Sequence, residues 1–249
     1  MKYRFLDEKK QHIHTLDGEP LTGTSTAVKN VMPPFLAKWG ATCAVDFLKE
    51  RIEKTFWRFL GVGYIRLSDL DKAINAWLSV RKKKAEAGTD MHSDLELYVK
   101  HCIENAKGIP TTVTDGKSDE VVAFSKWARA NVKRFLYSEV YVFSKDLWLG
   151  GIIDVVLELK DGRYVIGDFK SNPNVYFNMY MQAALYDLQQ AENGFYTADG
   201  EKIGEPLDIS AYNIYTFGGG FNAHEYVNMK DIREAAKGLV KINKLLPNY

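Results

Sequence analysis

The chain has 249 residues, and its 33 Lys and Arg against 32 Asp and Glu give a formal net charge of +1. Hydrophobic residues make up 46% and charged residues 26%, which is typical of a folded globular protein and excludes a disordered chain or a collagen-like repeat. Two cysteines are too few for a disulfide framework or a four-cysteine iron–sulfur cluster. Because no apolar run reaches the roughly 18 residues of a membrane span, we expect a soluble, cytoplasmic protein with no membrane partner.

The basic residues are unevenly distributed along the chain. The stretch 38–84 holds eleven Lys or Arg and five Asp or Glu, a balance of +6, so the remainder of the chain sums to −5. Such a separation can place a positive surface opposite an acidic pocket. The alternative interpretation is that these charges occupy the solvated faces of helices.

The first half of the chain is predicted to be mainly helical. An extended segment over 11–22, with a turn at Asp17-Gly18, precedes a short helix that Thr24 or Ser25 would cap and that ends before Pro33. Apolar residues spaced three and four apart predict four further helices. Their expected ranges are 35–59, 68–84, 89–107 and 118–135.

Strands are predicted to dominate the second half. Alternating or β-branched runs predict a three-stranded meander, over 139–143, 151–157 and 164–169. A helix over 175–190 then leads to a fourth strand over 209–217, which should run parallel to a neighbouring strand because a helix intervenes.

The chain is predicted to end with a short strand over 224–227 and a helix over 229–246. No repeat, low-complexity linker or domain boundary is visible. We therefore expect one α/β domain over 1–249, with a helical part over about 1–136 and a mixed αβ core over about 137–249.

Asp154, Asp168 and Lys170 form the most informative cluster. Asp168 and Lys170 are two residues apart on a predicted strand, so both side chains point to one face, and Asp154 lies on the preceding hairpin strand. Adjacent carboxylates repel unless a cation joins them, and Mg²⁺ or Mn²⁺ suits oxygen ligands. With Lys170 beside the metal, this arrangement favours phosphodiester hydrolysis. The alternative is a structural salt-bridge cluster.

The hairpin between these strands sets a geometric condition. A two-residue loop at Asp161-Gly162 would put Asp154 and Asp168 on opposite faces of the sheet, so a shared site requires an odd-length loop or a bulge. A second acid-x-Lys triplet, Glu158-Leu-Lys160, lies on the same strand as Asp154. About 13 Å along the strand would separate its acid from Asp154, which is too far to share a metal.

Two helical pairs supplement the cluster. His92 and Glu96 lie four residues apart near a predicted helix start, where His92 is a candidate metal ligand; the alternative is a partly buried histidine bonded to a neighbour. Gln182 and Tyr186 are also four apart, on the helix after the Asp168 strand. They would orient Lys170, the attacking water or a phosphate, or would simply pack.

Together these residues resemble the PD-(D/E)XK nuclease superfamily, and within it the RecB-like exonuclease group. The matching motifs are G-T-x-x-H at 88–92, an acidic strand residue at Glu139, G-x-I-D at 151–154, D-F-K at 168–170 and Q-x-x-x-Y at 182–186. The run from Thr24 to Val28, with Pro33, Leu36 and Trp39, is similar to the N-terminal segment of phage-type members and of mitochondrial genome maintenance exonucleases. The resemblance thus covers most of the chain.

The resemblance implies a restriction-endonuclease-like core, a mixed sheet flanked by helices, behind a helical N-terminal half, and Mg²⁺- or Mn²⁺-dependent cleavage of DNA. By the same resemblance, Lys170 is the catalytic lysine, Gln182 and Tyr186 support it, and Glu96 and Glu139 are further candidate supports. The implied metal ligands are His92, Asp154, Asp168 and the Phe169 carbonyl. Iron–sulfur relatives carry four cysteines, so no such cluster is expected here.

Six basic residues are candidate DNA contacts: Arg58, Arg66, Arg81, Lys82, Lys83 and Lys84. The aromatic residues Trp57, Phe59 and Tyr64 would stack on single-stranded bases or pack in a core. We predict a DNA nuclease, most simply an exonuclease on single-stranded or end-containing DNA in repair, recombination or replication, of phage or bacterial origin and with repair or recombination proteins as partners. The alternatives are a non-catalytic DNA-binding or complex-forming module with the nuclease fold, and a nuclease active only within a larger complex.

Overall fold

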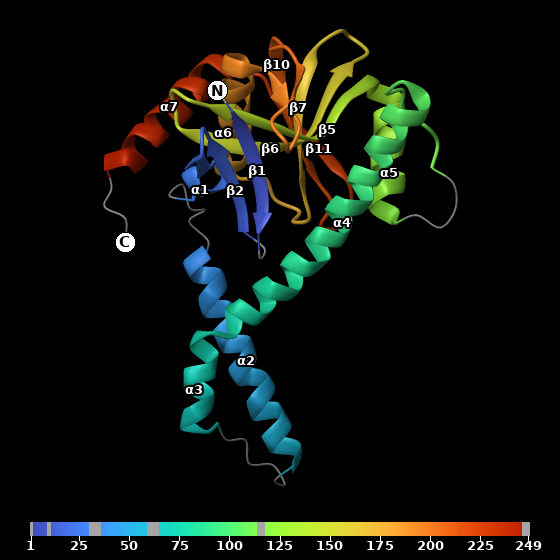
Figure 1. The fold of residues 1–249 in the computed structure, drawn as a ribbon. Coiled ribbons are helices and arrows are strands. Elements are labelled where there is room, and N and C mark those ends of the chain that lie inside the picture. The colour runs from blue at the N-terminus through green and yellow to red at the C-terminus, as the bar shows by residue number, and fades with distance from the viewer. Residues whose placement is uncertain (1, 9–10, 30–35, 59–64, 114–117, 246–249) are drawn as a thin grey trace. The chain divides into compact units, whose positions relative to one another are not determined.

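A computed structural model describes residues 2–8, 11–29, 36–58, 65–113 and 118–245 of the chain (Figure 1). The chain divides into two compact units, one formed by Met1–Val31 with Met91–Tyr249 and the other by Met32–Asp90. Each unit is described by itself below. The interpretation of 1–249 as a single domain stays a prediction.

An eight-stranded mixed sheet forms the centre of the larger unit. Its strands are β4 (Thr22–Gly23), β5 (Val132–Ser144), β6 (Leu149–Leu159), β7 (Tyr164–Lys170), β8 (Phe195–Tyr196), β9 (Lys202–Gly204), β10 (Ile209–Thr216) and β11 (Asn222–Tyr226). The strand order is β11-β10-β7-β6-β5-β8-β9, and β4 pairs with β6. β5, β6 and β7 form the predicted antiparallel meander, and β10 runs parallel to β7 as predicted. The mixed α/β class is therefore confirmed.

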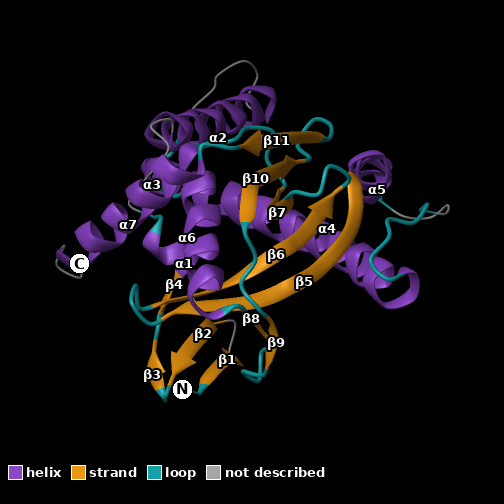
Figure 2. Ribbon diagram, turned by 90° about the horizontal axis from the view of Figure 1, so that it is seen from above, coloured by secondary structure: helices purple, strands orange, loops and turns teal. Residues whose placement is uncertain are grey.

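Helices cover both faces of this sheet (Figure 2). On one face lie α6 (Phe177–Asn193) and α7 (Met229–Leu245), whose buried residues share a core with Ile166 of β7. On the other face, residues 91–106 of α4 (Ala76–Ala106) and the helix α5 (Asp119–Asn131) pack around Phe169. Side chains of β7 thus point alternately to the two cores, as strand alternation requires.

The N-terminal segment is extended, as predicted for residues 11–22, and it also contains a strand before residue 11 that the sequence pattern did not predict. Residues before Thr24 form the strands β1 (Tyr3–Glu8), β2 (Gln11–Leu16) and β3 (Glu19–Pro20) of a small antiparallel sheet. The predicted turn at Asp17-Gly18 is confirmed, and both residues have positive φ (51° and 89°), as a two-residue hairpin turn demands. These strands are stable because their inner residues pack against Phe143 of β5, a contact between distant parts of the chain.

The short helix α1 (Thr24–Ala27) begins differently from the prediction. Gly23 takes the capping position, and no side chain caps the helix. Thr24 is buried and donates its hydroxyl to the Gly150 carbonyl on β6 instead (3.0 Å). Its role is therefore to fasten α1 to the sheet.

The smaller unit consists of α2 (Leu36–Arg58), α3 (Leu67–Ile74) and the first half of α4. The expected helix over 68–84 is wrong, because α3 ends at Ile74 and α4 begins at Ala76. The expected stop before Gly88 is also wrong, because α4 continues through it. One glycine costs a helix only about 1 kcal/mol, and the buried residues Leu95, Val99 and Cys102 stabilise its second half.

The last predicted N-terminal helix also ends earlier than expected. α5 ends at Asn131, and Val132 already pairs with Leu159 of β6, so the stretch up to Phe135 is strand. No helix among the described residues is long and apolar enough to cross a membrane.

Candidate active site

The loop between β6 and β7 has three residues, 160–162, between the hydrogen-bonded residues Leu159 and Arg163. Leu159 N–H donates to the Arg163 carbonyl across its base (2.8 Å), and Gly162 has a φ of 90°. A left-handed residue at the last loop position is the usual way to close a three-residue hairpin. The predicted odd-length loop is therefore confirmed.

This loop brings Asp154 and Asp168 to the same face of the sheet. In the observed register Val155 lies opposite Gly167, so the next position along each strand sets Asp154 opposite Asp168. The regular pairing of β6 with β7 ends there. Phe169 N–H instead donates to the Asp154 carboxylate (2.7 Å), which therefore lies where the two strands separate.

Asp168 and Lys170 form a buried ion pair. Lys170 Nζ lies 2.5 Å from Asp168 Oδ2, and the two side chains are 23% and 4% exposed. Apart from this ion pair, Asp168 Oδ2 has no hydrogen-bond partner among the described residues. Burial alone would lower the pKa of Lys170, but the Asp168 and Asp154 carboxylates raise it above its ordinary value. Lys170 is therefore a charged ammonium group.

Glu139 extends the acidic pair to a row of three. Ser138 lies opposite Val155, and Val140 opposite Ile153, so Glu139 occupies the position opposite Asp154. Its φ of 48° lies in the left-handed region, which is uncommon for residues other than glycine and asparagine. Glu139, Asp154 and Asp168 thus take corresponding positions on three adjacent strands.

The electrostatics of this row follow from burial and like charge. Burial and the Asp168 carboxylate raise the pKa of Asp154 to about 6, against opposing effects of His92 and Lys170. Burial, followed by the charges of Asp154 and Glu96, raises the pKa of Glu139 to about 8. The carboxylates therefore repel one another when they are ionised, and an added cation would reduce this repulsion.

The helical pair on α4 lies next to this row. His92 Nδ1 is 3.7 Å from Asp154 Oδ2, and the His92 ring meets the Phe169 ring edge-on. Glu96 forms an ion pair with Lys100, one turn further along α4. Both predicted residues of the α4 pair are thus close to the acidic row.

The helix α6 brings Gln182 and Tyr186 to the opposite side of the site. Gln182 Nε2 donates to the Tyr186 hydroxyl (2.7 Å). Burial and the charges of Asp168 and Asp154 raise the pKa of Tyr186 well above its ordinary value. The phenol is therefore neutral and able to donate a hydrogen bond.

Gly151 allows this approach of α6, and the adjacent Gly150 allows a similarly close approach of His14 from β2, roles that the sequence pattern did not predict. A Cβ on Gly151 would lie 2.5 Å from the Tyr186 ring and 2.6 Å from Thr24 Oγ1, and one on Gly150 would meet the His14 ring at 2.6 Å. Gln189 also donates to Thr24 Oγ1 (2.8 Å). The Gly-Gly pair three residues before Asp154 was the available signal.

The second acid-x-Lys triplet lies apart from the site, as expected. Glu158 accepts hydrogen bonds from Lys133 (2.7 Å) and Arg134 (2.6 Å), and Lys160 donates to the Arg129 carbonyl. These partners satisfy both charged groups, so the triplet serves as a matched structural control.

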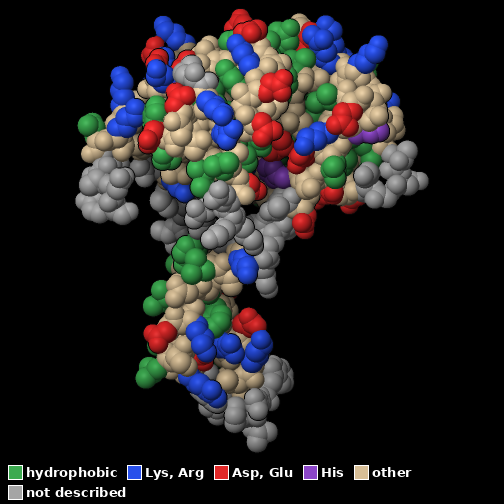
Figure 3. Space-filling model, viewed as in Figure 1, with side chains coloured by type: hydrophobic (Ala, Val, Ile, Leu, Met, Phe, Trp, Pro, Cys, Tyr) green, Lys and Arg blue, Asp and Glu red, His purple; other side chains and the backbone are tan. Residues whose placement is uncertain are grey.

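The candidate DNA contacts belong to the smaller unit. Arg66 and Lys82 are exposed, whereas the side chains of Arg58, Arg81, Lys83 and Lys84 lie outside the described residues, as do those of Trp57, Phe59 and Tyr64. Residues 32–90 hold eleven Lys or Arg and seven Asp or Glu, a net +4 that leaves −3 for the rest of the chain. On the face seen in Figure 3, blue side chains gather on the part of this unit formed by α2 and α3, whereas blue and red alternate over the larger unit.

A metal ion would find oxygen donors at the acidic row. Across the described parts of the chain, no group of three His, Cys, Asp or Glu side chains is already spaced to hold an ion. Mg²⁺, however, is commonly bound by one or two carboxylates, with waters and substrate phosphates completing the shell. Asp154 and Asp168, whose Oδ2 has no hydrogen-bond partner among the described residues besides its ion pair with Lys170, suit such an ion.

Comparison with known proteins gives no relative: no family model and no curated protein sequence matches the chain.

Proposed function

We propose that this protein is a divalent-metal-dependent DNA nuclease of the PD-(D/E)XK type, with Asp154, Asp168 and Lys170 at its centre. The observation that carries the proposal is the three-residue loop that brings Asp154 opposite Asp168. A buried Asp168 carboxylate beside the partly buried Asp154 carboxylate and Lys170 ammonium group is costly for stability, and such costs are typical of functional sites. The resemblance to the RecB-like group suggests an exonuclease acting on single-stranded or end-containing DNA.

Asp154 and Asp168 would hold Mg²⁺ or Mn²⁺, with His92 and the Phe169 carbonyl as further candidate ligands. When bound, the ion supplies a water of lowered pKa and neutralises charge on the phosphate. Lys170, held by Asp168 at 2.5 Å, directs an N–H donor at the attacking water or at a phosphate oxygen. A new bond from water oxygen to phosphorus replaces the bond to the sugar oxygen, which leaves with a proton.

The remaining site residues would keep this geometry. Tyr186 stays neutral because burial raises its pKa, and Gln182 fixes the direction of its hydroxyl. Both lie on α6, which Gly151 allows to approach β6 closely. Their proposed role is to orient Lys170 or a phosphate through hydrogen bonds.

The distribution of charge is consistent with DNA as the substrate. The smaller unit carries a net +4, and its basic residues would attract the phosphate backbone. The acidic row needs a cation before it can accept a phosphate at all. Binding of metal and binding of DNA are therefore expected to be coupled.

The test is Mg²⁺- or Mn²⁺-dependent degradation of linear DNA, single-stranded and double-stranded, by the purified chain. Asp168→Asn and Lys170→Ala should reduce the rate at least a hundredfold without loss of folding, since each removes a group that acts on the reacting phosphate. The matched controls Glu158→Gln and Lys160→Ala alter the second triplet and should leave the rate unchanged. Comparison of circular with end-containing substrates distinguishes endonuclease from exonuclease action.

Full activity of Asp168→Asn would overturn the proposal. A wild-type chain that binds DNA but neither binds metal nor cuts would favour a non-catalytic binding module. A chain that binds metal and cuts only after addition of repair or recombination proteins would point to a nuclease that acts within a complex.

A further inference from the structure

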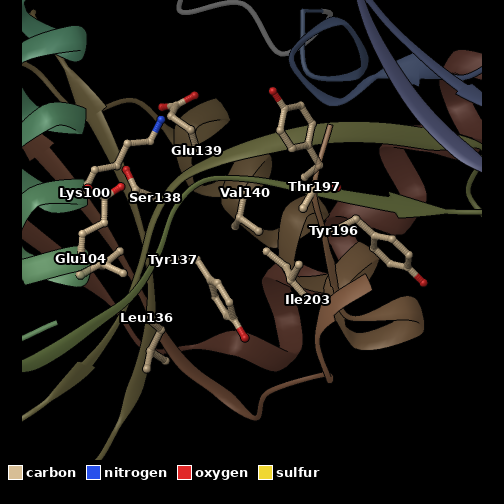
Figure 4. Close-up of a pocket in the computed structure, with 12 residues that line it drawn as sticks. Lys100, Glu104, Leu136, Tyr137, Ser138, Glu139, Val140, Tyr196, Thr197 and Ile203 are labelled. Carbon is tan, nitrogen blue, oxygen red and sulfur yellow. The ribbon is translucent and has the colours of Figure 1, made fainter. Parts of the chain in front are cut away.

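A cavity of about 330 Å³ lies beside Glu139, on the opposite side from Asp154. Its walls come from β5, α4, β8 and β9, and include Tyr137, Tyr141, Tyr196 and Ile203. In Figure 4 the polar groups Lys100, Glu104 and Glu139 gather at one end, and Tyr196, Thr197 and Ile203 lie at the other. The cavity thus joins an aromatic and aliphatic wall to a polar end next to the acidic row.

Among the described residues that line the polar end, no cation is left unpaired to attract a phosphate. Glu104 and Glu139 both line it, and the cation there, Lys100, is already paired with Glu96. Carboxylates accept hydrogen bonds from N–H groups, while tyrosine rings and aliphatic side chains favour a flat apolar body. A nucleobase combines both properties: it stacks through its faces and carries N–H donors on its edge.

The position of the cavity relates it to the proposed cleavage centre. Glu139 on β5 is the cross-strand neighbour of Asp154 on β6, and adjacent strands lie about 4.8 Å apart. A strand whose phosphate reached Asp154 and Asp168 would therefore bring an adjacent base to the mouth of the cavity. A base still paired in a duplex could not enter it.

Aromatic rings continue outward from this cavity. The ring of Tyr141 lies 4.9 Å from that of Phe5 on β1, and Phe5 lies 5.5 Å from the ring of His12 on β2. His12 is exposed and Phe5 and Tyr141 are half-buried, so the row is accessible from solvent. Such a row suits successive unpaired bases of one strand.

We infer that the cavity formed by Tyr137, Tyr141, Tyr196 and Ile203 holds one unpaired nucleobase, from a nucleotide next to the phosphate being cleaved. The inference rests on the proposed nuclease function and adds to it a base subsite. If the subsite is occupied during the reaction, cleavage requires at least one base that is not paired with a complementary base.

Equilibrium binding of single-stranded 12-mers that each lack the base at one position tests the inference. The oligonucleotides are fluorescently labelled, and binding to the full chain is measured by anisotropy with Ca²⁺ in place of Mg²⁺. At one position near the end, loss of the base should weaken binding to the wild-type protein about tenfold, as expected for a stacked base. At the other positions the effect should be smaller.

Variants of the cavity connect this loss to the protein. Tyr141→Leu, which removes the ring, should bind the complete 12-mer about tenfold more weakly and should be insensitive to the missing base, whereas Tyr141→Phe should behave as wild type. Ile203→Trp should fill the cavity from a site that is 45% exposed, and it should abolish the same base dependence. Tyr226→Leu, in a half-buried tyrosine pair with Tyr180 outside the cavity, is the control and should retain it.

Two results overturn the inference. Cleavage of DNA without any position-specific effect of a missing base would remove the subsite and leave the nuclease proposal intact. An equal effect of the missing base in wild type, Tyr141→Leu and Ile203→Trp would show that another part of the chain reads that base. Absence of both DNA binding and cleavage would instead reject the nuclease proposal and this inference with it.

Discussion

Asp154 and Asp168 occupy opposing positions on β6 and β7, and the Phe169 N–H donates to the Asp154 carboxylate at 2.7 Å. This relationship depends on a loop of three residues between the strands. With one residue fewer, every side chain of β7 would exchange faces relative to β6. The site is therefore a consequence of loop length as much as of the acidic residues themselves.

Gly162 is the residue that makes this loop possible, and substitution there isolates its backbone contribution. A Cβ at this position meets no atom within 4 Å, so the cost of a side chain comes from the φ of 90° alone. We expect Gly162→Val to lower the free energy of unfolding by about 1–2 kcal/mol and Gly162→Asn by clearly less. Chemical denaturation measures both; equal stability of the two variants would contradict the left-handed geometry.

Gly151 is expected to be intolerant for a different reason, which is space. The Cβ of Gly151→Ala would meet the Tyr186 ring at 2.5 Å, so α6 must shift; we expect a loss of about 1–3 kcal/mol and a reduced cleavage rate. Gly238→Ala on α7 meets nothing within 4 Å and should instead stabilise the protein by up to about 1 kcal/mol. Thermal unfolding of the two variants should therefore shift in opposite directions.

Glu139 should make the stability of the protein fall as pH rises. Its pKa is about 8 in the folded protein against an ordinary value of 4.5, so between these values the folded state binds more protons than the unfolded state. The free energy of unfolding then decreases with pH over this range. Glu139→Gln removes the effect, and should be more stable than wild type by roughly 1–3 kcal/mol at pH 8.5, with the difference vanishing near pH 4.5.

Glu158 supplies the control of opposite sign for this pH dependence. Hydrogen bonds from Lys133 and Arg134 hold its pKa below the ordinary value. Its stabilising contribution is therefore present above about pH 4.5 and is lost as pH falls. If Glu139→Gln and Glu158→Gln changed the pH profile in the same direction, the assignment of a destabilising charge to Glu139 would be wrong.

Metal binding should release protons, because in the free protein Glu139 holds one at pH 6–7 and Asp154 is about half protonated near pH 6. We expect the affinity for Mn²⁺ to increase between pH 6 and pH 8, most steeply in wild type and less in Glu139→Gln. Calorimetry in two buffers of different ionisation enthalpy counts the protons released. Unchanged Mn²⁺ binding by Asp154→Asn would exclude this carboxylate as a ligand.

The basic run 81–84 on α4 should contribute to DNA affinity through charge alone. Replacing all four residues with Gln should weaken binding uniformly across sequences and reduce the slope of log affinity against log salt by up to about 3 on single-stranded DNA. Lys2→Gln, in the larger unit, is the single-charge comparison. An unaltered slope would show that this part of α4 does not contact phosphates.

The sequence determined the strand order of the meander, the alternation that puts Asp168 and Lys170 on one face and Phe169 on the other, and the requirement for an odd loop. These are local properties, since strand alternation and turn geometry depend on neighbouring residues. The candidate pairs His92–Glu96 and Gln182–Tyr186 follow from helical spacing in the same way. Metal binding and catalysis by these residues stay predictions.

Only the tertiary structure decided the rest, because distant contacts outweighed local preference. Residues Tyr3–Glu8 form a strand whose Tyr3 packs on Phe143, and α4 passes through Gly88 since its second half is buried against the sheet. The cavity beside Glu139 combines residues from β5, α4 and β8–β9, up to about a hundred positions apart in sequence. No periodicity or spacing in the sequence predicts that these residues line one cavity, because the cavity forms only when the separate elements pack against one another.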